Sequence, residues 1–109
     1  RNEKTLSPEE KRLRALVEGI TPKKSLEPGR VDMCKCVLER LPEEERSLVV
    51  RAFRDRAKQL GVGYMRLFVA FLEDLAQQFG FALGYLVHAI NQAGSFFGFL
   101  KEKKIIASA

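Results

Sequence analysis

The stretch Tyr64–Phe79 reads YMRLFVAFLEDLAQQF and is apolar at most of its positions. Its polar residues are Arg66, Glu73, Asp74, Gln77 and Gln78. In an α-helix of 3.6 residues per turn, the apolar positions cover most of the circumference. A surface helix has one apolar stripe, whereas a helix that is apolar on most sides must be covered by neighbouring elements or by a partner. The stretch therefore predicts a buried, central helix over residues 64–79.

Five further segments have apolar residues at helical spacing, which is typical of helices with one buried face. These segments are residues 8–18, 31–41, 42–60, 81–93 and 95–104. No segment alternates apolar and polar residues in the way that a half-buried strand does. The sequence predicts an all-α fold, a compact bundle of five to six helices around the hydrophobic helix at about 64–79.

Capping residues mark several of the predicted helix boundaries. Ser7 and Ser95 precede helical segments, where a serine oxygen accepts a hydrogen bond from a backbone N–H of the first turn. Pro8 and Pro42 suit the first turn of a helix, which needs no donor from them. Gly61 interrupts the chain before the central helix.

The length of 109 residues fits one domain with a core of its own. The sequence begins with Arg1, so we interpret residues 1–109 as a single helical domain that is a fragment of a larger protein or a processed form. We expect residues 1–6 to be frayed. Residues 105–109 are expected to be frayed as well, or docked through Ile105 and Ile106.

Charge is distributed unevenly along the chain. The formal net charge is +5, and residues 1–60 hold most of the Lys, Arg, Asp and Glu residues. From Leu75 to Leu100 there is no Asp, Glu, Lys or Arg. A small positive excess permits binding to nucleic acid or to an anionic membrane without requiring either.

The uncharged stretch is long enough to cross a bilayer. It contains several glycines and a number of polar residues, among them Gln77, Gln78, His88, Asn91 and Gln92. Each polar side chain would need a partner in lipid, so integral membrane insertion is disfavoured. Peripheral membrane binding by residues 94–104 stays as a further alternative, because aromatic and lysine side chains occur together there.

The leading functional hypothesis is a non-enzymatic regulatory or adaptor module that binds a protein partner or a second copy of itself. Its predicted binding surface is the apolar C-terminal group of Phe96, Phe97, Phe99 and Leu100. These side chains point to more than one side of a short helix, and an exposed apolar patch marks an interface. The other interpretation is that they belong to the core.

The alternative hypothesis is nucleic-acid binding through the basic face of the helix at 42–60. The predicted contacts are Arg46, Arg51, Arg54, Lys58, Lys101, Lys103 and Lys104. Cations on one helix face neutralise phosphates and make binding salt-dependent. The sequence gives no sign of an exposed aromatic residue among these charges that would stack on bases.

We predict no catalytic site, no metal site and no cofactor. His88 is the only histidine and has no nucleophile beside it in the sequence. Cys34 and Cys36 are too few and too closely spaced for a zinc site. Cys34 is in phase with the apolar face of its helix and is expected in the core, with Cys36 at the periphery. Free thiols predict a reducing, cytoplasmic location.

Overall fold

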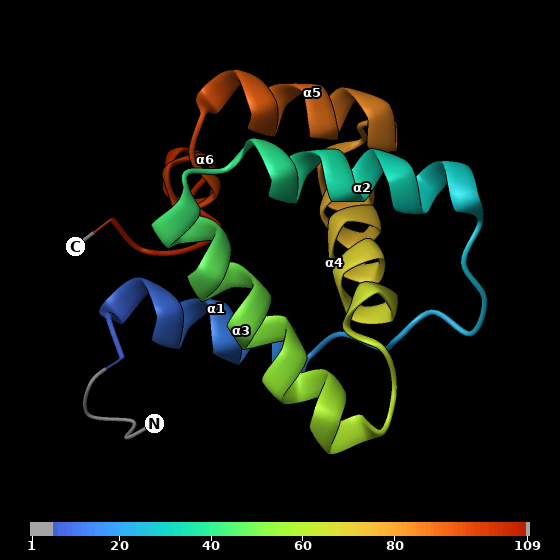
Figure 1. Ribbon diagram of the computed structural model, residues 1–109. Coiled ribbons are helices and arrows are strands. Elements are labelled where there is room, and N and C mark those ends of the chain that lie inside the picture. Colours follow the sequence, from blue (N-terminus) through green and yellow to red (C-terminus); the bar gives the residue numbers. More distant parts are fainter. Residues whose placement is uncertain (1–5, 109) are drawn as a thin grey trace.

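The computed structural model describes residues 6–108, and within them the chain forms six helices and no strand (Figure 1). The helices are α1 (Pro8–Glu18), α2 (Pro28–Arg40), α3 (Glu43–Leu60), α4 (Tyr64–Phe79), α5 (Leu83–Ala93) and α6 (Phe96–Glu102). The predicted all-α bundle is confirmed.

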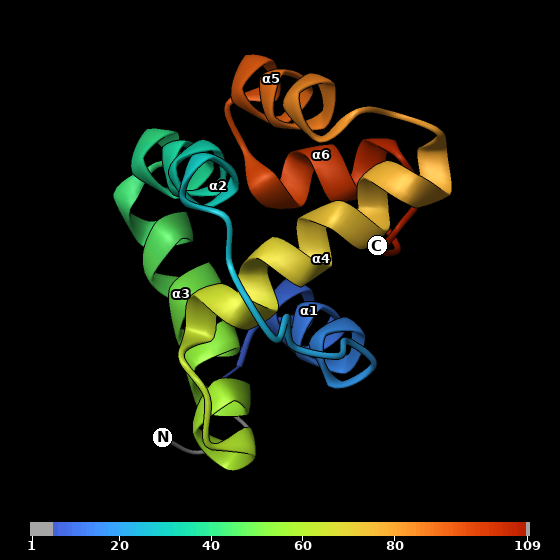
Figure 2. The same cartoon turned by 90° about the vertical axis from the view of Figure 1, so that its right-hand side faces the viewer.

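Helix α4 lies at the centre of the bundle. Figure 2 shows it crossing the molecule with α1 on one side and α5 and α6 on the other. Eight of its residues are buried, namely Leu67, Phe68, Val69, Ala70, Phe71, Leu72, Leu75 and Ala76. The buried run leaves Asp74, Gln77 and Gln78 exposed along one edge. Burial on most sides is what the apolar composition of residues 64–79 predicts.

Four phenylalanine rings join three helices in the core. Phe53 of α3 meets Phe68 and Phe71 of α4 edge-on, with centroid distances of 5.1 and 5.3 Å. Phe96 of α6 lies 6.1 Å from each of the same two α4 rings. Such aromatic pairs contribute about 0.5–1.5 kcal/mol each beyond the burial of their area. The rings therefore hold α3 and α6 against α4.

The ends of α1 and α2 show where capping residues predict a boundary and where they do not. The Oγ atom of Ser7 accepts a hydrogen bond from the N–H of Glu10 at 3.1 Å, and α1 ends before Gly19. Helix α2 begins at Pro28, three residues before the predicted start. Pro28 is its first residue, and the missing N–H of proline costs nothing there because the first N–H groups of a helix have no partner within it.

The corner between α4 and α5 explains why α5 is shorter than predicted. Gly80 has a φ of 69°, a left-handed conformation that favours glycine. The N–H of Phe81 then donates to the carbonyl of Ala76 at 2.8 Å. Phe81 therefore closes the end of α4, and α5 begins only at Leu83.

The C-terminal segment after α6 is docked against the bundle. Lys104 has a φ of 60°, and α6 ends at Glu102 rather than near residue 104. The N–H of Ile105 donates to the carbonyl of Leu100 at 2.8 Å, and the side chain of Ile106 is buried. The expected fraying therefore does not apply to residues 105 and 106, and docking through the isoleucines is found instead. Of the expected frayed segment 1–6, residues 1–5 lie outside the described part of the chain.

None of the helices within residues 6–108 has the length and hydropathy needed to cross a bilayer.

Candidate functional site

The four residues predicted to form an apolar binding surface lie in the core. Phe96, Phe97, Phe99 and Leu100 are all buried, with at most 7% of any of these residues exposed. The expectation that they form an exposed patch is wrong. The physical reason is that α6 is only seven residues long and is enclosed by α4, α5 and the docked C-terminal segment, so more than one of its sides is covered.

Glu45 of α3 fixes the start of α6 in this buried position. Its carboxylate accepts hydrogen bonds from Ser95 Oγ at 2.7 Å and from the N–H groups of Phe96 at 2.5 Å and Phe97 at 3.4 Å. Ser95 Oγ also accepts a hydrogen bond from the N–H of Gly98. A carboxylate at a helix N-terminus satisfies free backbone donors and interacts favourably with the helix dipole.

The exposed side of α5 and the preceding corner form an uncharged surface instead. Tyr85 is 60% exposed, and its ring contacts Phe81 edge-on at 4.8 Å. Phe81 in turn stacks on Phe79 at 5.8 Å, and both are half-buried. We call this region the α5 surface, defined by Phe79, Phe81, Gly84, Tyr85, His88, Ala89, Gln92 and Ala93. It belongs to the sequence segment that has no charged residue.

A hollow of about 390 Å³ lies beside Tyr85. Its walls come from α5 and α6, and they are Tyr85, His88, Ala89, Gln92, Ala93, Phe99, Glu102 and Lys103. Small side chains on α5 leave this space open next to a large exposed ring. The α5 surface thus presents a protruding aromatic residue and a recess side by side.

Three of the predicted nucleic-acid contacts already interact with other side chains of the fold, two with carboxylates and one with an aromatic ring. Arg51 forms an ion pair with Glu10 at 3.2 Å. Lys101 forms one with Glu9 at 2.6 Å, and its hydrogen bond lowers the pKa of Glu9. Lys103 lies over the ring of Phe99, 5.9 Å from its centroid.

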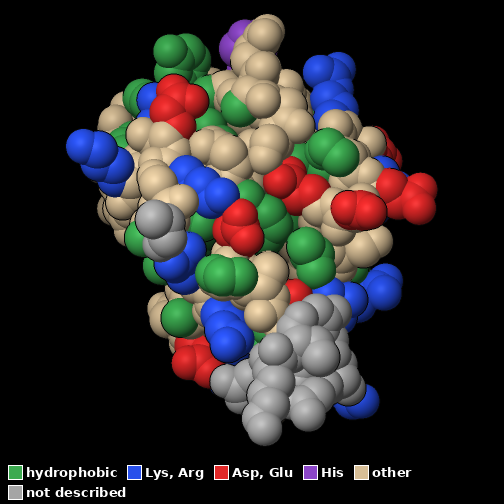
Figure 3. All heavy atoms as spheres, turned by 90° about the vertical axis from the view of Figure 1, so that its left-hand side faces the viewer, with side chains coloured by type: hydrophobic (Ala, Val, Ile, Leu, Met, Phe, Trp, Pro, Cys, Tyr) green, Lys and Arg blue, Asp and Glu red, His purple; other side chains and the backbone are tan. Residues whose placement is uncertain are grey.

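The remaining basic residues differ in their surroundings. Arg46, Arg54 and Lys58 follow one side of α3, and Lys104 is exposed after α6. On the face shown in Figure 3, Lys and Arg side chains are interspersed with Asp and Glu side chains among the described residues. The seven predicted contacts therefore do not form one continuous basic surface. Arg46, Arg54 and Lys58 of α3 form a separate group.

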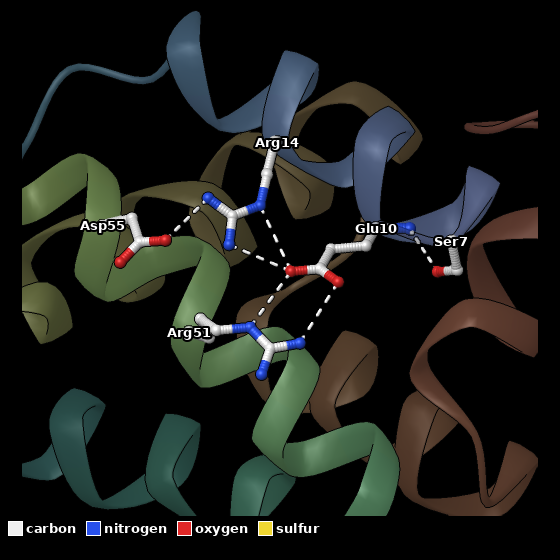
Figure 4. Close-up of polar contacts among 5 residues, drawn as sticks. All are labelled: Ser7, Glu10, Arg14, Arg51 and Asp55. Carbon is white, nitrogen blue, oxygen red and sulfur yellow. Dashed lines mark hydrogen bonds and ion pairs between the residues drawn. The ribbon is translucent and has the colours of Figure 1, made fainter. Parts of the chain in front are cut away.

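An ion network around the buried carboxylate of Glu10 joins α1 to α3 (Figure 4). Glu10 has no exposed surface, and its Oε2 atom accepts hydrogen bonds from Arg14 at 2.9 Å and from Arg51 at 3.2 Å. Arg14 also pairs with Asp55 at 2.8 Å. Partial burial acts to lower the pKa of Arg14, but its hydrogen bonds to Glu10 and Asp55 outweigh burial and raise it. Glu10 belongs to the first turn of α1, and only the packing of α1 on α3 reveals this network.

The nucleophile candidates are not assembled into a reactive group. Burial raises the pKa of Cys34 to about 12, so its thiol is protonated at neutral pH. Cys36 is half-buried and accepts a long contact of 3.9 Å from Asn91 Nδ2. His88 is exposed, with Gln92 Nε2 at 3.5 Å from its Nε2 atom. The predicted positions of Cys34 in the core and Cys36 at the periphery are confirmed. Among the described residues, no three His, Cys, Asp or Glu side chains are grouped so as to hold a metal ion.

A second hollow, of about 470 Å³, lies between residues 23–30 and α4. Its two cations pair with two carboxylates: Lys23 with Glu73 at 2.9 Å, and Arg30 with Glu73 at 3.2 Å and with Glu27 at 3.9 Å. Because these charges are neutralised within the fold, this hollow does not attract an anion as strongly as its lysine and arginine suggest.

Comparisons of the chain with protein-family models, with curated proteins and with solved structures give no match.

Proposed function

We propose that this protein is a non-enzymatic interaction module that associates with a second copy of itself through the α5 surface. The observation that carries the proposal is Tyr85, a large ring that is 60% exposed on a segment without charged residues. Interface cores are depleted in charge and enriched in tyrosine, tryptophan and phenylalanine. The proposal keeps the predicted burial of apolar side chains on binding. It places the binding surface on α5 instead of on Phe96–Leu100 of α6.

A second copy suits this surface for geometric reasons. In a twofold-symmetric dimer the same patch is used by both subunits. Tyr85 of each copy would then enter the hollow beside Tyr85 of the other, since ring and recess lie next to each other on one surface. A self-complementary patch of this kind needs no further partner.

Electrostatics supports the same partner. Each copy has a formal net charge of +5, so two copies repel one another over most approaches. The α5 surface contains no Lys, Arg, Asp or Glu, and the recess beside it carries one residue of each sign, Glu102 and Lys103. Two copies that meet there therefore avoid most of the repulsion that their net charges cause elsewhere. Helix α5 has 11 residues and a length of roughly 16 Å, which places the contact at the small end of specific interfaces. We therefore propose a weak, reversible dimer with a dissociation constant in the micromolar range.

The location proposed with this function is a reducing one. Both cysteines are free thiols, and free thiols persist where the cell keeps cysteines reduced.

Analytical ultracentrifugation over a range of protein concentrations tests the proposal. We expect a monomer–dimer equilibrium that Tyr85→Ser weakens at least tenfold, because the ring that fills the recess is lost. Leu60→Ser is the matched control: Leu60 is the other large exposed apolar residue, 40% exposed at the end of α3. Both substitutions leave the net charge unchanged.

Three outcomes would contradict the proposal. A chain that stays monomeric at the highest concentrations rules out self-association. Equal weakening by Leu60→Ser and Tyr85→Ser places the contact elsewhere. A dimer that dissociates when salt is added would indicate a charged interface rather than the uncharged α5 surface.

A further inference from the structure

Apart from Arg56, whose guanidinium donates to Gln59 Oε1 and to the carbonyl of Glu18, three cationic side chains on α3 have no acidic partner within residues 6–108. Arg46, Arg54 and Lys58 form no ion pair there, whereas Arg14 and Arg51 are held by carboxylates. Arg54 and Lys58 are exposed, and Arg46 is half-buried. These three cations are therefore available to an external anion.

Their spacing places them along one line. Arg46, Val50, Arg54 and Lys58 are four residues apart, so they follow one slanted row on the surface of α3, which turns by about 120° from the first to the last. From the first to the last is 12 residues, or roughly 18 Å along the helix. A row of cations of this length suits an anion with repeated charges better than a single small ion.

An aromatic ring lies within this row, which the sequence does not reveal. Tyr64, the first residue of α4, has the guanidinium of Arg54 over its ring at 5.2 Å from the centroid. Tyr64 and Arg54 line a shallow hollow of about 500 Å³ on α3. Its other walls are Arg46, Ser47, Val50, Arg51 and Asp55. The sequence gives no sign of an aromatic residue among these charges, and it is the α3–α4 corner that places a half-buried tyrosine beside them.

The acidic residues near the hollow do not cancel its charge. Asp55 is held by Arg14 at 2.8 Å, so its carboxylate is already compensated. Glu43 and Glu44 belong to the first turn of α3, before Arg46. The cationic row starts where these carboxylates end.

We propose that this row, Arg46, Arg54, Lys58 and Tyr64, binds single-stranded nucleic acid. The three cations contact successive phosphates, and an unpaired base stacks at the ring of Tyr64 and the guanidinium of Arg54. Cations beside an aromatic platform are the combination by which proteins bind single strands without sequence preference. Paired bases in a duplex offer no free face for stacking, so the duplex is the poorer ligand. The site uses no residue of the α5 surface.

Fluorescence anisotropy with a short labelled oligodeoxythymidine tests the charge contribution. The double variant Arg54→Gln with Lys58→Gln should bind more weakly. Its plot of log affinity against log salt, measured from about 50 to about 200 mM, should be shallower by about 1.4, since two phosphate contacts are lost. The control is Lys35→Gln with Arg40→Gln, which removes the same two charges from exposed positions on α2 and should change neither quantity.

Substitution of the ring tests the stacking contribution. Tyr64→Leu should weaken binding about tenfold at every salt concentration, and Tyr64→Phe should restore it. Circular dichroism melting shows whether each variant is folded. The Tyr85→Ser variant should bind the oligonucleotide as the unchanged chain does, which separates this site from the proposed dimer.

Four results would overturn the inference. The first is no binding of the oligonucleotide at the lowest salt concentration. The second is an equal loss in the α2 control, which would mean that net charge alone is responsible. The third is equal affinity for a duplex of the same length. The fourth is tighter binding to phosphatidylserine vesicles than to the oligonucleotide, which would make the row a membrane contact.

Discussion

The carboxylate of Glu10 has no exposed surface and lies between the guanidinium groups of Arg14 and Arg51. A buried carboxylate loses its hydration, and only opposite charges and hydrogen bonds compensate for that loss. Here one arginine comes from the same helix and the other from α3. At the scale of a single residue, Glu10 therefore fixes how α1 lies against α3.

Glu10→Gln tests this role. The substitution keeps the shape of the side chain but removes its charge, so we expect the free energy of unfolding to fall by about 3 kcal/mol. Urea denaturation measures it. Glu18→Gln is the control, since Glu18 is exposed on the same helix and should change stability by less than about 0.5 kcal/mol. Similar small losses in both variants would show that the network contributes little to stability.

Helix α6 owes its buried position to contacts with other elements. Seven residues are too few to form a stable helix alone, so α6 depends on tertiary packing. Its first turn is held by Glu45 of α3, and Phe96 reaches the α4 rings. At the scale of elements, α3 and α4 together organise the C-terminal part of the bundle.

Glu45→Ala should therefore destabilise α6 in particular. Removal of the carboxylate leaves donors of Ser95 and Phe96 without their partner, at a cost of about 1–2 kcal/mol. Urea denaturation gives the loss in stability. Relative to the unchanged chain, amide hydrogen exchange should become faster in residues 98–102 of the variant and should change less in α4.

The control for this experiment is Glu44→Ala. Glu44 is also in the first turn of α3 but is exposed, so it shares the favourable interaction with the dipole of α3 and lacks the contact with α6. If both variants lose the same stability and α6 exchanges at an unchanged rate, the cap does not hold α6 in place.

Both ends of the described chain lie on the left side of the molecule in Figure 1. Glu9 of α1 pairs with Lys101 of α6, and Arg12 Nη1 donates to the carbonyl of Ala107 at 3.4 Å. Ile106, which lies between Lys101 and Ala107 in the sequence, is buried. At the scale of the whole molecule, the C-terminal segment closes the bundle against α1.

Truncation tests this closure. Removal of residues 105–109 should lower the free energy of unfolding by about 2 kcal/mol or more, mainly through exposure of the site that Ile106 fills. Removal of residues 107–109 alone keeps Ile106 and should cost much less. Thermal and urea denaturation of the two truncated chains give the comparison. Equal stability of both would mean that the isoleucine contributes nothing by its burial.

The sequence alone determines the class of fold and the helix at its centre. Apolar periodicity and capping residues are local properties, so residues 64–79, Ser7 and Ser95 predict their structure without knowledge of their neighbours. The same reasoning places Cys34 in the core and Cys36 outside it. Errors at the starts of α2 and α5 are of a few residues, because Pro28 occupies the first helical position of α2 and Phe81 closes the end of α4, and periodicity shows neither.

Only the tertiary structure decides which apolar and charged residues are free to bind. Phe96 and Tyr85 are both aromatic residues of the uncharged segment, yet packing buries the first and exposes the second. Arg51 and Arg54 differ by less than one helical turn, yet only Arg51 faces the carboxylate of Glu10. Arg51 pairs with a residue 41 positions away, and Phe96 packs on Phe68 and Phe71 of another helix, so exposure and ion pairing follow from how the helices pack and not from the local pattern.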